Sequence, residues 1–408
     1  MENGIIHNRD IIMFGLQPWD IAIGSNFKNM AWEMAKHNRI LYVNRPLDRI
    51  TAWKNPAEAS IKTRKESIKK GLRILEEIKN NLWVLNPPVM LESINWIPPG
   101  KFYNYLNKRN NKKLAAQINH AAGQLSITNP ILIIDNDFFN GLYLKEFLKI
   151  DCMVYYIRDY LLSQSYFLKH GILSEPAIMA KADIVTANSI YLAEYAKKYN
   201  AHAYYIGQGC DVNDFLNAPK DFPKDISTIK KPVVGYCGAL ISSRLDIDLL
   251  ISIAKQKPQC NIVLIGPEDN DFKKSALHSL TNVHFLGSKP SAELPAYIHY
   301  FDVCINPQAV NQMTIGNYPR KVDEYLAAGK PVVATATDTM KEFAACTYLC
   351  NSAQEYTSAI ETILEKPVDE NIIRERVSVA KSHTWEASIA KLYSSINKLN
   401  AISDAGTR

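Results

Sequence analysis

Residues 317–335 read NYPRKVDEYLAAGKPVVAT, and this stretch decides the fold. Val322, Tyr325 and Leu326 fall at i, i+3 and i+4, a spacing that gives a helix one apolar face. Gly329 stands where a left-handed helix end would be, and the proline two positions later prevents the helix from continuing. The apolar run after that proline is typical of a short buried strand. The stretch therefore predicts a helix, a turn and a strand, which together are the repeating unit of an α/β protein.

The first turn of this predicted helix carries two cations, and an acid follows. Pro319 suits the helix start, where its missing N–H is not needed. A helix N-terminus favours phosphate through its free N–H groups and partial positive charge, and Arg320 and Lys321 add full charges there. Glu324 follows one turn later, where its carboxylate could accept hydrogen bonds from ribose hydroxyls. The group suits a sugar nucleotide, although Arg320 and Glu324 also have the i,i+4 spacing of an ordinary surface ion pair.

The alternation of apolar runs and helical patterns extends over the whole chain. It predicts parallel sheets covered by helices, in two halves. We expect helices at 26–37, 141–149, 189–199 and 385–399. The predicted strands are 11–16, 39–44, 81–86, 131–135, 152–157, 183–187 and 203–207 in the first half, and 233–237, 261–266, 283–287, 302–306 and 331–335 in the second.

The polar segment 217–232, which contains Lys and Pro, separates the two halves and is typical of a linker. We therefore predict an N-terminal Rossmann-like domain at 1–216, a second Rossmann-like domain at 233–384 and a closing helix within 385–408. In open parallel sheets the ligand binds beyond the carboxyl ends of the strands. Two such edges facing each other would form a cleft between the domains.

Length and composition limit the class of protein. The 408 residues are too many for one ordinary core, and 47% hydrophobic with 22% charged residues is the composition of a globular protein. A net charge of +6 permits an anionic ligand or a membrane surface as partner. Seven scattered cysteines disfavour a disulfide framework or a zinc site. Without an apolar signal region or spanning segment, we expect a cytoplasmic protein that could dock on the inner face of the membrane.

The candidate site residues directly follow the predicted strands. In the second half they are mostly glycines, which let backbone N–H groups approach an anion: Gly238, Gly266 with Pro267, and Gly287. In the first half, the candidates are Trp19, Asp20, Asp159 and Tyr160. Equally, Arg158 and Asp159 could form a loop ion pair and Trp19 could anchor the core. The absence of a G-x-G-x-x-G after the first strand and of a P-loop disfavours a dehydrogenase or an NTPase.

Residues 96–113 form a second candidate surface. The part 101–113, KFYNYLNKRNNKK, combines five cations and three aromatic residues with no acid. One interpretation is a membrane-surface patch near a lipid-linked acceptor. The other interpretation is the solvated basic face of a helix.

The motifs resemble those of one enzyme family. PRKVDEYLAAGKPVVAT resembles the nucleotide-sugar-binding segment of glycosyltransferases of the GT-B fold, in particular the family-four (group 1) retaining enzymes of cell-surface polysaccharide biosynthesis. GYCGALISSRLDIDLL (235–250) resembles the first loop and helix of their donor domain. NIVLIGP (261–267) and the run 282–307 resemble the strands that follow. HTWEASIAKLY resembles the closing helix that crosses back to the first domain.

The resemblance implies roles for individual residues. Glu324 matches the carboxylate that holds the donor ribose, and Lys321 and Arg244 match cations that face the diphosphate. Gly316 stands where many members carry a second glutamate, and Ala239 replaces the usual basic residue of the first loop. Arg244 could instead simply open a helix that Ser242 caps. The implied site comprises Arg244, Lys321 and Glu324 as catalytic residues and Gly238, Gly266, Pro267, Gly287, Pro319, Arg320 and Glu324 as donor-binding residues.

The implied activity is transfer of a sugar, with retention, from a nucleotide-diphosphate-sugar donor to a saccharide or lipid-linked acceptor. The domain at 233–384 would bind the nucleotide sugar, and the domain at 1–216 would bind the acceptor, with Trp19, Asp20, Asp159 and Tyr160 as the acceptor-side candidates. No metal and no cofactor beyond the nucleotide-sugar substrate is expected, because Arg and Lys supply the positive charge, and no nucleic-acid partner is expected. Two alternatives stay open. One is a nucleotide-sugar epimerase on the same fold, and the other is a degenerate module that binds a sugar nucleotide without catalysis, which the residues Gly316 and Ala239 favour.

Overall fold

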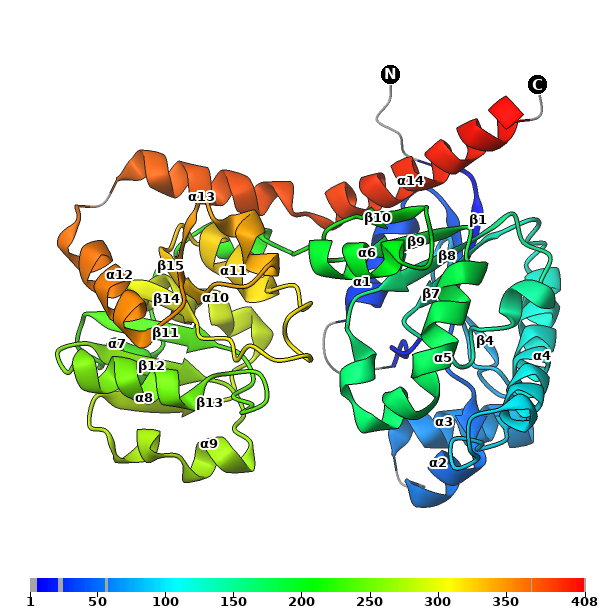
Figure 1. Cartoon of the computed structure of the whole chain (residues 1–408), viewed down its shortest axis with the longest axis horizontal. Helices are drawn as coiled ribbons and strands as arrows, with labels where there is room; N and C mark the ends of the chain where they lie inside the picture. The colour runs from blue at the N-terminus through cyan, green and yellow to red at the C-terminus, as the bar shows by residue number, and fades with distance from the viewer. Residues whose placement is uncertain (1–5, 21–24, 56–57, 368, 407–408) are drawn as a thin grey trace. The chain divides into compact units, whose positions relative to one another are not determined.

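The computed structural model describes residues 6–20, 25–55, 58–367 and 369–406 (Figure 1). The chain divides into two compact units. The first consists of Met1–Gly207 with Ser388–Arg408, and the second of Gln208–Ala387. Each unit is an α/β body with a mainly parallel sheet, as the alternation of apolar runs and helical patterns predicts.

The first unit contains an eight-stranded sheet with the order β10-β9-β8-β7-β1-β2-β5-β4. All neighbouring strands are parallel except β4 and β5. A short parallel pair, β3 with β6, lies apart from this sheet. The strands are β1 (Asp10–Gly15), β2 (Arg39–Val43), β3 (Leu47–Asp48), β4 (Leu75–Lys79), β5 (Leu82–Leu85), β6 (Met90–Leu91), β7 (Ile131–Asp135), β8 (Cys152–Ile157), β9 (Ile184–Ala187) and β10 (Ala203–Tyr205).

Helices cover this sheet. The core lies between the helices and strands such as β7 and β8, whose residues are all buried. Tyr393 of the last helix hydrogen-bonds to Asn38 at 3.0 Å, so α14 packs on the first unit. The helices are α1 (Asn26–Met34), α2 (Arg49–Lys54), α3 (Ala59–Lys70), α4 (Lys101–Gln124), α5 (Ser165–Lys181), α6 (Ile190–Lys197) and α14 (Trp385–Gly406).

One predicted helix of the first unit is wrong. The segment 141–149 forms only a 3-10 turn, Leu144–Glu146. Its apolar residues Leu142, Leu144 and Leu148 are nevertheless buried in the core. The spacing of the apolar residues in this segment therefore reflects their burial in the core and not the periodicity of a helix.

The second unit contains a six-stranded sheet, all parallel, with the order β13-β12-β11-β14-β15-β16. The segment 217–232, predicted as a linker, belongs to this unit, because Ile226 and Ile229 are buried in its core. The strands are β11 (Val233–Cys237), β12 (Asn261–Ile265), β13 (Val283–Gly287), β14 (Val303–Asn306), β15 (Val332–Thr335) and β16 (Thr347–Cys350). The helices are α7 (Lys224–Ser227), α8 (Ile247–Gln256), α9 (Asn270–Lys274), α10 (Leu294–Tyr300), α11 (Arg320–Ala327), α12 (Ala353–Glu365) and α13 (Glu370–Ser382).

Candidate functional site

Helix α11 is the helix that the segment 317–335 predicts. Its apolar face is buried, and it ends in a left-handed turn at Gly329, whose φ is +71°. Pro319 differs from the prediction: it precedes the helix, with φ −87° and ψ 67°, and Arg320 is the first helical residue. The free N–H groups and the cations of the first turn therefore begin at Arg320.

Lys321 lies against the end of the central strand β11. A Cβ atom on Gly238, the residue after that strand, would be 2.1 Å from Lys321 Cε and 2.8 Å from its Nζ. The same Nζ lies 5.2 Å from the centre of the Tyr236 ring, within the range of a cation–π interaction. The side chain of Lys321 thus runs through space that exists only because residue 238 has no side chain.

Beside Lys321, backbone hydrogen bonds join the glycine-containing ends of β11, β12 and β13 to one another. Gly238 N donates to Ile265 O at 2.8 Å, and Gly266 N donates to Gly287 O at 2.9 Å. Gly266 has φ +147°, and a Cβ there would lie 1.9 Å from Gly238 O. Pro267 O accepts a hydrogen bond from the backbone of the first loop. The predicted donor-binding glycines are therefore neighbours at the carboxyl edge of this sheet, where open α/β sheets bind ligands.

Glu324 forms the i,i+4 ion pair with Arg320 that its spacing allows. Arg320 Nη2 lies 3.2 Å from Glu324 Oε1, and the carboxylate side chain is 11% exposed while that of Arg320 is 42% exposed. Burial opposes the charge on Arg320, but the adjacent carboxylate outweighs it and raises the pKa of the guanidinium. The pair holds a carboxylate one turn into the helix.

Arg244 occupies an exposed turn between β11 and α8. Asp246, whose Oδ1 accepts from Leu249 N at 2.9 Å, caps α8, so Ser242 is not the cap. Arg244 O accepts a hydrogen bond from Ala309 N at 2.9 Å, which ties the turn to the loop before α11. Within the described residues, the Arg244 guanidinium forms no hydrogen bond or ion pair with Lys321 or Glu324.

The sequence interpretation missed a buried network behind α11. Asp323 Oδ1 lies 2.8 Å from His383 Nδ1, and Asp323 Oδ2 accepts from the Tyr318 hydroxyl at 2.8 Å. Burial raises the pKa of Asp323 to about 6, although His383 and Tyr318 act in the opposite direction. The Tyr325 hydroxyl accepts from Cys237 N at 2.9 Å and so fixes the end of β11. One sequence feature could have indicated this network: Asp323 is a charged residue on the apolar face of the predicted helix.

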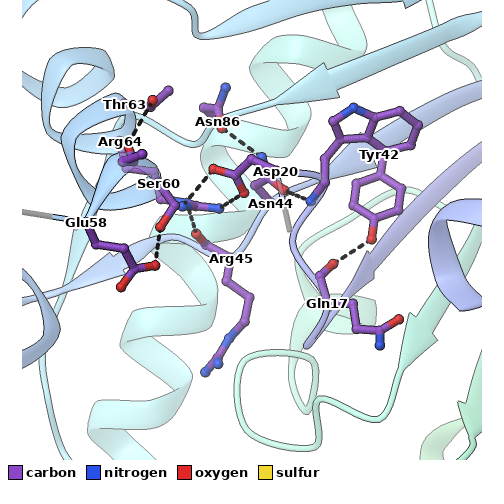
Figure 2. Close-up of polar contacts among 12 residues, drawn as sticks. Gln17, Asp20, Tyr42, Asn44, Arg45, Glu58, Ser60, Thr63, Arg64 and Asn86 are labelled. Carbon is purple, nitrogen blue, oxygen red and sulfur yellow. Dashed lines mark hydrogen bonds and ion pairs between the residues drawn. The ribbon is translucent and has the colours of Figure 1, made fainter. Parts of the chain in front are cut away.

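In the first unit, Asp20 is held by a buried arginine that the sequence did not indicate (Figure 2). Arg64 Nη2 lies 2.9 Å from Asp20 Oδ1, and the Arg64 side chain is only 7% exposed. Arg64 Nε also donates to Arg45 O at 3.1 Å. The Trp19 N donates to Asn44 Oδ1 at 2.6 Å, which fixes the loop that carries Asp20.

Asp159 and Tyr160 follow β8 as predicted. Arg158 lies between two carboxylates, with Nε 2.8 Å from Asp135 Oδ1 and Nη1 2.8 Å from Asp159 Oδ2. Asp135 is fully buried, and burial raises its pKa. Tyr160 packs against Tyr195, with 5.4 Å between the ring centres. Arg158 and Asp159 therefore form the loop ion pair, and Arg158 also pairs with Asp135, a buried residue at the end of β7.

Two further features are absent from the described residues. No helix among them is both long and apolar enough to cross a membrane. No group of three or more His, Cys, Asp or Glu residues there is placed to hold a metal ion.

Comparisons with known proteins agree with this geometry. Residues 231–366 match the family model described as Glycosyl transferases group 1. Over 240 residues the chain is 29% identical to TuaH of Bacillus subtilis (strain 168), which is assigned to teichuronic acid biosynthesis as a glycosyltransferase. This match covers 55% of the chain and spans 60% of the length of TuaH.

Solved structures resemble the chain over almost its whole length. HepE of Anabaena in complex with UDP has a TM-score of 0.60 at 16% identity, covering 98% of this chain and 99% of that one. The trehalose 6-phosphate synthase of Burkholderia multivorans has a TM-score of 0.62 at 11% identity, covering 99% of both chains. Residues 231–366 of the second unit thus match the glycosyl transferases group 1 model, and the chain as a whole has the two-domain GT-B fold.

Proposed function

We propose that the protein is a glycosyltransferase that moves a sugar from a nucleotide-diphosphate-sugar donor, bound by the second unit, to an acceptor bound by the first. The observation that carries the proposal is the packing of Lys321 against Gly238 at the start of α11, with Glu324 one turn later. A helix start, a cation and glycine loops in one place suit a diphosphate. The crystal structures of HepE with UDP and with UDP-glucose support a nucleotide-sugar donor on this fold.

The candidate residues of the second unit would contact different parts of the donor. Lys321, with Arg244 on the neighbouring turn, faces the diphosphate and stabilises the negative charge that grows as it departs. Glu324 accepts hydrogen bonds from the ribose hydroxyls, and its ion pair with Arg320 holds this carboxylate in position. Because these cations supply the positive charge, the reaction proceeds without a divalent metal. Turnover that persists in EDTA would support this part of the proposal, and turnover that requires added Mg²⁺ or Mn²⁺ would contradict it.

The reaction proposed is a front-face substitution with retention. The bond between the anomeric carbon and the diphosphate oxygen breaks, and a bond from that carbon to an acceptor hydroxyl oxygen forms on the same face. The acceptor proton passes to the leaving phosphate, so that no protein base is needed. The contribution of the protein is then positioning and charge stabilisation.

The acceptor is proposed to be a saccharide or a lipid-linked saccharide of surface polysaccharide synthesis. The assignment of TuaH to teichuronic acid biosynthesis supports this class of product. Trp19, Asp20, Asp159 and Tyr160 lie beyond carboxyl ends of strands in the first unit, where an acceptor would bind. Asp20 and Asp159 are both held by arginines, so their role would be to hydrogen-bond acceptor hydroxyls from fixed positions.

A thermal-shift screen with UDP-, GDP-, ADP- and dTDP-sugars tests the donor assignment. A ligand at a hundred times its Kd stabilises the fold by about 2.7 kcal/mol, which corresponds to a rise in Tm of roughly 3 °C if the whole chain unfolds as one unit. Lys321→Ala should lose the shift, and the surface variant Lys255→Ala should keep it. If no sugar nucleotide shifts the Tm of the wild-type protein, the proposal fails.

Incubation with the identified donor separates the alternatives. Transfer to an acceptor extract supports the glycosyltransferase. Isomerised sugar from the donor alone would support the epimerase. Binding without hydrolysis, transfer or isomerisation would support the degenerate module.

A further inference from the structure

Three segments of the first unit that are distant in sequence contain cations but no acid. They are 49–55, 93–113 and 160–174, and together they hold eight Lys or Arg residues and no Asp or Glu. Arg49, Lys108 and Lys113 pair with the carboxylates of Glu92 or Glu146 outside these segments. Among the described residues, Lys101 and Lys112 are exposed and have no ion-pair partner, so the segments carry a net positive charge.

The same segments expose apolar side chains that a monomer normally covers. Trp53 is 79% exposed and Trp96 is 72% exposed. On α4 and α5, Phe102 is 62%, Tyr166 is 55% and Leu173 is 65% exposed. Single exposed apolar residues are common on protein surfaces, but a contiguous group marks an interaction site.

Contacts join the second and third segments into one surface. Lys169 Nζ of α5 donates to Asn95 O at 2.7 Å and to Trp96 O at 3.0 Å. The rings of Tyr103 on α4 and His170 on α5 stack with 3.7 Å between their centres. We call the exposed part of 49–54, 94–112 and 166–173 the apolar–basic face.

The apolar–basic face surrounds a pocket of about 210 Å³. Ile50, Trp96 and Tyr166, one from each segment, all line it, which brings the first segment to the other two. Arg45, Asn95 and Asn140 also line it, as do the acidic residues Asp48 and Glu92, which lie just outside the three segments. The Asn95 Oδ1 atom is buried without a hydrogen-bond partner in the described structure. Drug-sized ligands occupy ~300–1,000 Å³, so this smaller pocket suits a single polar ring.

We propose that the apolar–basic face docks the first unit on an anionic lipid bilayer and that its pocket receives a sugar ring of a lipid-linked acceptor held in that bilayer. Trp and Tyr favour the boundary between lipid and water, because one end of each side chain is apolar and the other is polar. Lys residues without an ion-pair partner attract anionic lipids electrostatically when they lie near the membrane surface. The proposal deepens the proposed function, and its acceptor part rests on that function.

Co-sedimentation with phosphatidylcholine vesicles, with and without phosphatidylglycerol, tests the docking. The wild-type protein should bind the anionic vesicles, and added salt should weaken this binding. The double variant Lys101→Glu/Lys112→Glu should bind them at least roughly tenfold more weakly. The control Lys255→Glu/Lys274→Glu has the same net charge, but its two exposed residues lie in the second unit, and it should bind like the wild type.

The apolar part of the docking needs its own pair of variants. Trp96→Ser/Phe102→Ser should lose vesicle binding, while Leu72→Ser/Ile372→Ser should keep it. Leu72 and Ile372 are 51% and 43% exposed and lie outside the apolar–basic face. Equal binding by all four variants and the wild type would overturn the proposal. So would light scattering that shows a wild-type dimer and a monomeric Trp96→Ser/Phe102→Ser variant, because the face would then join two copies of the chain.

The pocket is tested with n-octyl β-D-glucoside below its micelle concentration, by saturation-transfer NMR. The glucoside ring protons should receive saturation from the wild-type protein and lose it in Ile50→Trp, which narrows the pocket mouth. Equal saturation in both proteins would reject the pocket as the sugar site. All these variants should keep the thermal shift caused by the sugar nucleotide. If the wild-type protein itself shows no thermal shift with any sugar nucleotide, the result counts against the proposed function and not against the docking.

Discussion

Gly238 and Lys321 are in contact in a way that allows no side chain at residue 238. A Cβ on Gly238 would lie 2.1 Å from Lys321 Cε, and the φ of Gly238 is +146°, which other residues rarely adopt. The two residues are far apart in sequence but meet where β11 ends and α11 begins. The position of the Lys321 cation therefore depends on the conformation of a glycine loop.

Gly238→Ala should displace Lys321 and strain the loop. We expect the kcat/KM for sugar transfer to fall at least roughly tenfold, since a positive φ costs a non-glycine residue about 1–2 kcal/mol and the side chain of Lys321 must also move. The matched control is Gly123→Ala near the end of α4, where a Cβ would meet nothing within 4 Å. Steady-state kinetics beside circular dichroism of both variants measures the difference. If Gly238→Ala folds and has the kinetics of the wild type, the conformation of this loop is not needed for sugar transfer.

Lys321→Ala should remove charge stabilisation from the departing diphosphate. By analogy with the loss of one oxyanion-hole donor, kcat should fall by a factor of roughly 10²–10³. Glu324→Ala should nearly abolish transfer as well, because it removes the proposed ribose ligand and leaves Arg320 without its carboxylate. Both variants should unfold within a few degrees of the wild type, because neither side chain belongs to the apolar core. Turnover like that of the wild type in both would reject the donor assignment.

Asp20→Asn should destabilise the first unit through Arg64. The variant leaves a guanidinium, 7% exposed, without its anionic partner, which should lower the free energy of unfolding by about 1.5–3 kcal/mol. A double-mutant cycle with Arg64→Met, followed by urea unfolding, measures the coupling. If Asp20 also binds acceptor, Asp20→Asn should raise the KM for acceptor while leaving the KM for donor unchanged. Additive effects on stability would show that the pair contributes nothing to folding.

Glu175 should make stability depend on pH. Burial raises the pKa of this α5 carboxyl from 4.5 to about 7, although the Tyr195 hydroxyl, 3.0 Å away, acts in the opposite direction. The folded protein then binds this proton more tightly than the unfolded chain does. The stabilisation is fully present below 4.5 and is lost as the pH rises through about 7.

The Glu175→Gln variant isolates that contribution. Relative to the variant, the wild type should lose about 3 kcal/mol of unfolding free energy as the pH rises from about 4 to about 8. Urea unfolding of both proteins across this range gives the difference. The exposed variant Glu194→Gln on α6 is the control and should show no such trend. A difference that stays constant with pH would contradict the raised pKa.

The strands of both sheets were largely predictable from sequence, and the reason is burial. In a parallel sheet covered on both faces most strand residues are buried and apolar, so runs such as ILIID and VVGYC stand out. Strand β4 was missed because it is an edge strand that reads LEEIK and keeps its charges in solvent. Strand β16, TYLC, is only partly buried and was missed too.

The parts of the site that are local in sequence were also predictable. Arg320, Lys321 and Glu324 occupy consecutive turns of one helix, so spacing alone brought them together. The partners Arg64 and His383 lie 44 and 60 residues from Asp20 and Asp323, and no periodicity links them. Such pairs follow from how strands and helices are ordered in space, which sequence spacing does not encode.

The donor groups and the apolar–basic face come from different units of the chain. Gly238, Lys321 and Glu324 belong to Gln208–Ala387, and the face belongs entirely to the other unit. If the two proposals hold, substitutions that change which sugar is transferred can accumulate in one unit without changing the membrane-binding surface of the other. Under the proposed assignment, a chimera joining this second unit to the first unit of a relative would glycosylate the relative's acceptor with this protein's sugar.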